Sequence, residues 1–242
     1  MKSARFFSVI AAIAVLSAVF FVESASAHYL WVVQEGDVYY VARGGLLDKF
    51  EPYNPGAVVL IKAFDREGME VPTRRSDQKE RVSFSADKSV SLAAVMTEWG
   101  SRVNTTKGKK LMTKKEAEAQ GFKVLQAFTS TQTSKTVFED GSSVCKPLGL
   151  KFEIVPERSP FSLKPGEEMK IKVLFEGAPI KDSAVSSGQN ARAVTDKEGN
   201  AAIALSPDGW NVIMAQHRVM TPNDSEYNFR QFMTFFVFKV KR

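Results

Sequence analysis

The chain has 242 residues, a formal net charge of +6 at pH 7, two histidines and a single cysteine. One cysteine excludes an internal disulfide, so the fold has to be stabilised by a buried core. Apart from a lysine-rich stretch from Lys107 to Lys115, the Lys and Arg residues are scattered, and they do not alternate with aromatic residues as they would in a nucleic-acid-binding surface. We therefore expect no nucleic-acid partner.

The N-terminus has the pattern of a secretory signal peptide. Two basic residues precede an apolar run over residues 8–22, and the small-residue motif Ala25-Ser26-Ala27 follows it closely. A basic start, an apolar run shorter than the about 20 residues of a membrane span, and an A-x-A site are typical of such leaders. We predict that residues 1–27 are a signal peptide, that the mature chain begins at His28, and that it is periplasmic or otherwise secreted, without stable membrane insertion after cleavage.

The segment 28–155 has the pattern of a β domain with one helical insertion. Thr113 and Glu116 form a capping box and Gly121 is a typical helix stop, which predicts at most two helical turns from Lys114 to Gln120. The rest consists of apolar and aromatic runs separated by turn-forming residues, which favours short strands. The runs that we assign to strands are 29–33, 38–42, 57–64, 81–85 and 91–96.

The segment 156–242 shows a clearer strand pattern. Apolar residues occupy alternate positions over 169–175, and further strand-like runs follow, each bounded by Gly, Pro or Asp. Strands at this spacing favour an antiparallel sandwich of immunoglobulin-like size. We therefore predict an all-β protein of two immunoglobulin-like antiparallel β-sandwich domains in tandem, over 28–155 and 156–242, with one short helix.

The two histidines are the candidate metal ligands. After cleavage His28 would offer its α-amine and its imidazole, which can chelate one metal ion together. His217, at the end of the strand that starts at Trp210, is the candidate second imidazole. Imidazole nitrogen suits nickel, cobalt, copper and zinc. The alternative interpretation is a solvated terminal histidine and a separate, hydrogen-bonded strand-end histidine.

Other side chains contribute less to this hypothesis. Glu35, Asp37 and Glu98 could each add a carboxylate to a metal site, and the sequence does not choose among them. Cys145 could be a soft metal ligand, but a lone cysteine is more often a small buried apolar residue. We expect it to be core.

Several motifs occur in an order that resembles the DUF4198 family of exported proteins, which are described as periplasmic components of cobalt/nickel uptake systems. Ala-His-Tyr-Leu-Trp at 27–31 resembles the start of the mature family sequence. Glu-Pro-Tyr-Asn-Pro at 51–55, Lys-Pro-Leu-Gly-Leu at 146–150 and the segment 209–217 resemble later motifs. The likeness spans nearly all of the mature chain.

The resemblance implies transition-metal handling outside the cytoplasm, with His28 and His217 at the family's histidine positions. The chain departs from the family pattern at Gly44-Gly45-Leu46, where many members carry a further Gly-His. A missing imidazole there would mean fewer ligands, a carboxylate in its place, or no metal.

Together these features predict a periplasmic nickel- or cobalt-binding protein that delivers the metal to the components of a membrane uptake transporter. Copper and zinc remain possible occupants of the same site. We expect a binding protein, not an enzyme. Two alternatives stay open: a non-metal β-sandwich adhesion or assembly module, and a copper-dependent oxidase-type enzyme that uses a terminal-histidine site.

Overall fold

The structure is a computed structural model that describes residues 28–45, 47, 49–164, 166–188, 191–206 and 209–239. The predicted signal peptide lies outside the described residues. The described chain is built from three β-sheets and one short α-helix.

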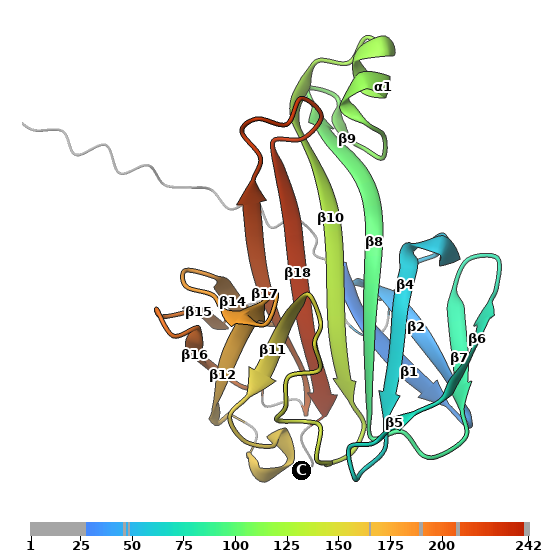
Figure 1. Cartoon of the computed structure of the whole chain (residues 1–242), viewed down its shortest axis with the longest axis vertical. Helices are drawn as coiled ribbons and strands as arrows, with labels where there is room; N and C mark the ends of the chain where they lie inside the picture. Colours follow the sequence, from blue (N-terminus) through green and yellow to red (C-terminus); the bar gives the residue numbers. More distant parts are fainter. Residues whose placement is uncertain are drawn as a thin grey trace, which may run out of the picture.

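A large central sheet carries strands from both halves of the chain (Figure 1). Its path is β15-β14-β17-β18-β10-β8-β4-β5, and β9 pairs with β8. Neighbouring strands pair antiparallel except β10 and β18, which run parallel with residues 128–137 beside residues 229–238. The bounds are β4 (Val58–Phe64), β5 (Glu70–Val71), β8 (Leu92–Thr105), β9 (Gly108–Lys110), β10 (Val124–Val137), β14 (Ala184–Ser187), β15 (Ala191–Val194), β17 (Trp210–Met220) and β18 (Phe229–Lys239).

Two smaller sheets cover the two faces of the central sheet. The five-stranded sheet contains β1 (Tyr29–Glu35), β2 (Val38–Gly45), β3 (Lys49–Phe50), β6 (Thr73–Asp77) and β7 (Val82–Ala86). The four-stranded sheet contains β11 (Phe152–Pro156), β12 (Glu168–Phe175), β13 (Ala178–Pro179) and β16 (Asn200–Ala204). In Figure 1, β11 and β12 lie in front of the central sheet, and β1 and β2 lie behind it.

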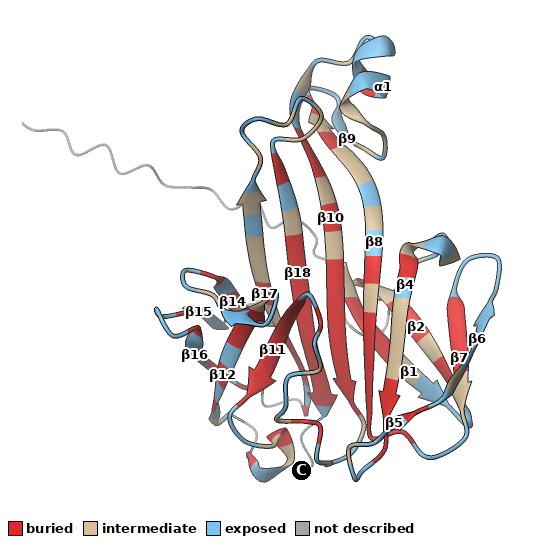
Figure 2. Cartoon of the chain, in the orientation of Figure 1, coloured by how far each residue is buried: buried red, intermediate tan, exposed pale blue. Residues whose placement is uncertain are grey.

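Two separate cores fill the spaces between the three layers. Along β18, Phe236 and Phe238 pack in the core beneath the four-stranded sheet, whereas Phe235 and Val237 pack in the core beneath the five-stranded sheet. Successive side chains of a strand point to opposite faces, so a strand with both faces covered is apolar at consecutive positions. Figure 2 shows this burial along β8, β10 and β18 in the body of the molecule.

The fold is all-β sandwich, as the sequence predicts, and the two halves of the chain share one sheet. The parallel pair β10–β18 joins the N-terminal strands to the C-terminal strands. β11, which ends at the expected boundary near Val155, pairs with β12 and so belongs to the sheet of the C-terminal half. Each sandwich therefore packs partly against strands that the other half supplies.

The helix α1 (Lys114–Ala119) is the short helix that the capping box predicts, and it lies in the insertion between β9 and β10. The Thr113 hydroxyl accepts from the Glu116 amide, and the Glu116 carboxylate accepts from the Thr113 amide. Two 3-10 turns, η1 (Pro55–Ala57) and η2 (Pro160–Ser162), complete the helical content of the described residues. No helix in this part of the chain is long and apolar enough to cross a membrane.

Polar side chains of the central strand β10 fasten both outer sheets. On one face the Thr136 hydroxyl accepts from the Val32 amide of β1 at 2.9 Å. On the other face the Thr133 hydroxyl donates to the Phe152 carbonyl of β11, and Lys135 forms an ion pair with Glu153. Buried polar groups are tolerated when they are hydrogen-bonded, and here the bonds run between layers.

Candidate functional site

His28 lies immediately before β1 and contacts a carboxylate. Its Nδ1 lies 2.7 Å from Oε2 of Glu51, and both side chains are about one-third exposed. Nη1 of Arg43 donates to the same carboxylate oxygen at 3.0 Å. Partial burial, and then the positive charge of Arg43, lower the pKa of His28 below its ordinary value, and Glu51 only partly offsets them.

The pairing of β1, β2 and β3 determines this arrangement. β1 and β2 pair so that Tyr29 faces Gly44, and the Glu51 amide donates to the Arg43 carbonyl at 2.8 Å. Gly44 has φ of +155°, and a Cβ there would lie 1.6 Å from the Lys49 carbonyl oxygen. Only glycine fits so close an approach. Gly44, the first residue of the Gly44-Gly45-Leu46 segment that departs from the family pattern, thus allows β3 to fold back and bring Glu51 to His28.

His217 lies elsewhere, on the opposite face of the central sheet. It sits in β17, and its ring packs 5.0 Å from the ring of Phe175 and 6.2 Å from that of Phe152, both in the four-stranded sheet. Partial burial lowers its pKa. His28 belongs to the other side, where Tyr29 packs on Phe235 beneath the five-stranded sheet.

The structure therefore does not bring the two predicted ligands together, and our expectation that they are neighbours is corrected. Alternation in β17 places His217 with Ile213 and Ala215 on the face that the four-stranded sheet covers. β1, by contrast, is in the layer on the other side. Among the described residues, no group of three or more His, Cys, Asp and Glu side chains is placed to hold a metal ion.

The other candidate metal ligands do not lie together in one site either. Cys145 is half-buried against the core beneath the four-stranded sheet, and burial raises the pKa of its thiol, as expected for a core cysteine. Glu35 ends β1 and Asp37 lies in the β1–β2 turn, at the far end of β1 from His28. Glu98 lies in β8 and lines a pocket near His28. The carboxylate that contacts His28 is Glu51, which the sequence marked only as part of a motif.

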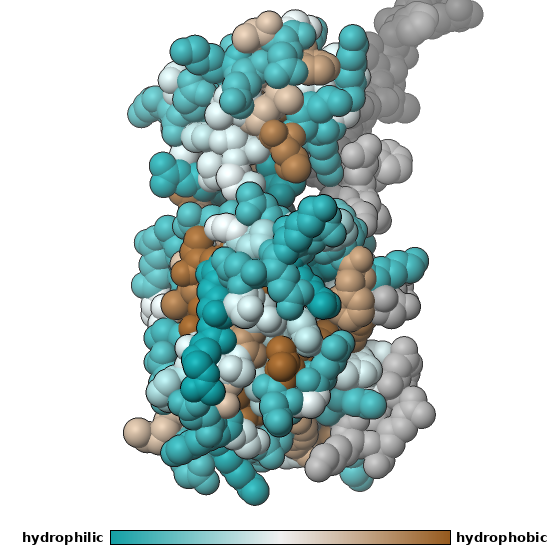
Figure 3. Space-filling view, turned by 90° about the vertical axis from the view of Figure 1, so that its right-hand side faces the viewer, coloured by the Kyte–Doolittle hydropathy of each residue, from teal (hydrophilic) through white to brown (hydrophobic). Residues whose placement is uncertain are grey.

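This pocket, of about 490 Å³, is lined by Arg43, Arg102, Trp99, Tyr53 and Glu98 among others. The Arg43 guanidinium stacks over Trp99 at 4.7 Å from the ring centroid, and Tyr53 meets Trp99 edge-on at 5.8 Å. Burial and the charge of nearby Arg43 lower the pKa of Arg102. Figure 3 shows a notch between the tip of the long strands and the body of the molecule on this side.

Because of a β-bulge in β8, the side chains of Trp99 and Arg102 both line this pocket. Residues three apart in a regular strand point to opposite faces. Here Glu98 pairs with Thr131 but Ser101 pairs with Thr129, so two residues of β8 stand opposite one residue of β10. Sequence reasoning missed this pair, and glycine at position 100, inside a strand, was the available signal for the bulge.

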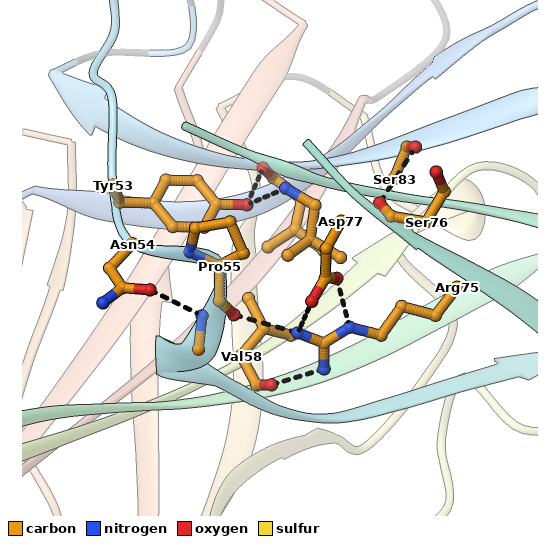
Figure 4. A network of polar contacts seen from close by, with 11 residues as sticks. Tyr53, Asn54, Pro55, Val58, Arg75, Ser76, Asp77 and Ser83 are labelled. Carbon is orange, nitrogen blue, oxygen red and sulfur yellow. Dashed lines mark hydrogen bonds and ion pairs between the residues drawn. The ribbon is translucent and has the colours of Figure 1, made fainter. Parts of the chain in front are cut away.

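The segment that contains η1 forms the pocket rim, and the Arg75 side chain holds this segment in place (Figure 4). Arg75 of β6 donates to the Val58 carbonyl at 2.6 Å and to the Pro55 carbonyl at 2.9 Å. Its Nε also pairs with Asp77 at 2.6 Å, which orients the guanidinium. The rim is therefore fixed to the five-stranded sheet by charge-assisted bonds.

Tyr53 anchors the other end of the rim. Its hydroxyl donates to the Val41 carbonyl at 2.7 Å and accepts from the Val82 amide at 3.0 Å. Burial raises its pKa to about 12, so the phenol stays protonated and keeps donating. The wall beside Arg43 and Trp99 is thus held rigid.

The model of the family described as "Domain of unknown function (DUF4198)" matches residues 25–219. No curated protein and no solved structure matches the chain. The matched span includes both histidines and every pocket residue named above.

Proposed function

The chain belongs to the DUF4198 family, and we propose that it is an exported protein that binds a divalent transition metal, nickel or cobalt, at its mature N-terminus. The observation that carries this proposal is the 2.7 Å contact between Nδ1 of His28 and the Glu51 carboxylate. It pairs an imidazole nitrogen with a carboxylate oxygen at the predicted processing site.

The donor set is completed by cleavage after Ala27. The α-amine of His28 and its Nδ1 would then close a six-membered ring around a metal ion, and Glu51 would supply an oxygen. Nitrogen and oxygen donors of this kind suit nickel, cobalt, copper and zinc. Arg43 would stay bonded to Glu51 as an outer partner that orients the carboxylate, a common arrangement at metal sites.

His217 has no part in this site. Its ring packs on Phe175 across the central sheet from His28, so we assign it a packing role. This revises the two-histidine site that the sequence suggested. The metal is cargo in this proposal, and its destination is a membrane uptake transporter, as the family resemblance implies. The proposal includes no catalytic step.

Three variants of the processed protein test the site by calorimetric titration with Ni(II) and Co(II). His28→Ala should weaken binding by more than about a hundredfold, and Glu51→Gln by about tenfold to a hundredfold, because loss of a ligand costs at least what loss of an outer partner does. His217→Phe is the matched control, since it removes the other imidazole and keeps an aromatic ring against Phe175. It should bind as the unaltered protein does.

Equal losses in His28→Ala and His217→Phe would contradict the one-histidine site. Absence of Ni(II) and Co(II) binding in the unaltered processed protein would refute metal delivery and favour an adhesion or assembly module. Tight binding confined to copper, with redox turnover, would favour the oxidase-type alternative.

A further inference from the structure

Arg102 is a half-buried cation without a counter-charge. Its guanidinium has no hydrogen bond or ion pair to any described residue, and its charged neighbours in the pocket wall include Arg43. Burial and Arg43 both lower its pKa, which means that the surroundings disfavour its charge. An arginine keeps its charge in proteins, so an anion placed beside it would relieve this cost.

The walls around Arg102 include aromatic and aliphatic side chains. Trp99 lies beneath the Arg43 guanidinium, and Tyr53 is held by two hydrogen bonds. Leu111, on the tip side of the notch, is highly exposed and lines the same pocket. A volume of about 490 Å³ falls within the range of small-molecule sites.

Neither acidic side chain nearby, Glu51 or Glu98, forms an ion pair with Arg102. Glu51 is already shared by Arg43 and His28. Glu98 of β8 is exposed, lines the pocket, and makes no ion pair with a described residue. Arg102 therefore remains the cation available to a ligand, beside an aromatic surface.

We propose that this pocket binds a small organic carboxylate, whose carboxylate pairs with Arg102 while its apolar body rests on Trp99 and Leu111. Arginine is suited to this task because its planar guanidinium can bond both oxygens of a carboxylate. The inference does not rest on the metal proposal, since neither Arg102 nor Trp99 is a proposed metal ligand and the test uses metal-free protein.

The test is an NMR titration of the metal-free processed protein, observed at the indole N–H signal of Trp99, which a Trp99→Phe variant identifies. Benzoate and hexanoate are the probes, because they share a carboxylate and an apolar body but differ in flatness. Benzamide, the neutral analogue of benzoate, and inorganic phosphate are the comparison ligands. Both carboxylates should shift the Trp99 signal in a saturable way, whereas benzamide and phosphate should not.

Variants locate the interaction. Arg102→Gln should weaken benzoate binding by about tenfold or more, the effect of losing a charge-assisted hydrogen bond. Arg102→Lys keeps the positive charge but cannot bond both carboxylate oxygens, so its affinity for benzoate should lie between those of the unaltered protein and Arg102→Gln. This variant controls for a folding defect in Arg102→Gln. Glu98→Gln should bind benzoate equally or more tightly, because it removes from the pocket a negative charge that repels the carboxylate.

Arg66→Gln is the matched control. Arg66 is exposed in the turn at the opposite end of β4 and forms no ion pair with a described residue, so its loss should change affinity by less than about twofold in physiological salt. Binding of benzamide as tight as that of benzoate, an unchanged Arg102→Gln, or no response to either carboxylate would overturn the proposal. Equal binding of phosphate would also overturn it, because the site would then select charge alone.

Discussion

Replacing Glu153 by glutamine should destabilise the folded protein by about 3–5 kcal/mol, because it leaves the Lys135 ammonium buried without its counter-charge. Nζ of Lys135 lies 2.6 Å from Oε2 of Glu153, and the two side chains are 1% and 0% exposed. Neither side chain is in contact with bulk solvent at such a site. The pair also joins β10 to β11, so its loss loosens the contact between the central and four-stranded sheets.

Proton release limits the part of this cost that comes from the unpaired Lys135 ammonium. Burial already lowers the pKa of Lys135, and Glu153 is the neighbour that most opposes this shift. Without Glu153 the lysine can become neutral, and holding a lysine neutral at pH 7 costs about 4–5 kcal/mol relative to its ordinary pKa of about 10.4. The Lys146 and Ile154 carbonyls, at 3.1 and 3.2 Å, remain as partners and keep this part of the cost below that limit.

Urea unfolding at about pH 7 and about pH 9.5 measures the effect and its sign. In Glu153→Gln the unfolded chain binds a proton at Lys135 that the folded chain lacks, so stability should rise with pH and the gap to the unaltered protein should narrow. The control is Glu176→Gln, which breaks an exposed pair with Lys151 at 3.6 Å and should cost less than about 1 kcal/mol. A cost below about 1 kcal/mol for Glu153→Gln, or a gap that does not change with pH, would refute the reasoning.

Three further predictions follow from single contacts. Burial lowers the pKa of His217, so its contribution to stability is complete above about pH 6.5 and is lost as the pH falls below that value. His217→Phe should therefore lose less stability than the unaltered protein between about pH 7.5 and about pH 5.5. An equal loss of stability in the two proteins, measured by urea unfolding, would contradict this. Arg75→Ala removes the clamp on η1 and should speed amide hydrogen exchange at Ala57 and Val58, and unchanged exchange there would show that the rim is held otherwise. Thr113→Ala should cost helix α1 about 1 kcal/mol of local stability, visible as faster exchange confined to the tip; unchanged exchange in α1 would argue against the cap.

The sequence was sufficient for the fold class because most strands show apolar alternation between turn residues. We did not predict β10 from the sequence, although it is the central strand that joins the two halves of the chain. Its Ser, Thr and Lys side chains resemble an exposed loop in composition, yet Thr133, Lys135 and Thr136 are buried between three layers. Their hydrogen-bond partners come from β1 and β11, which no local pattern identifies.

The candidate site was only partly predictable for a related reason. His28 was identified from the processing motif, which is local. The separation from His217 depends on which layer covers each face of the central sheet, and strand alternation alone does not give that. Arg102 and Trp99 share a pocket because a β-bulge at Gly100 changes the alternation of β8. Glu51 reaches His28 through the close approach at Gly44, which has no apolar signature.

The comparison of two N-termini tests the central claim most directly. Ni(II) affinity, measured by calorimetry, is compared between protein that begins at a free His28 and the same protein with the α-amine of His28 acetylated. Acetylation turns this amine into an amide, which removes one nitrogen donor and leaves the imidazole and Glu51 in place. We predict that the acetylated protein binds Ni(II) at least about tenfold more weakly, a change of about 1.4 kcal/mol or more. Equal affinity of the two proteins would contradict a metal site built on the mature N-terminus.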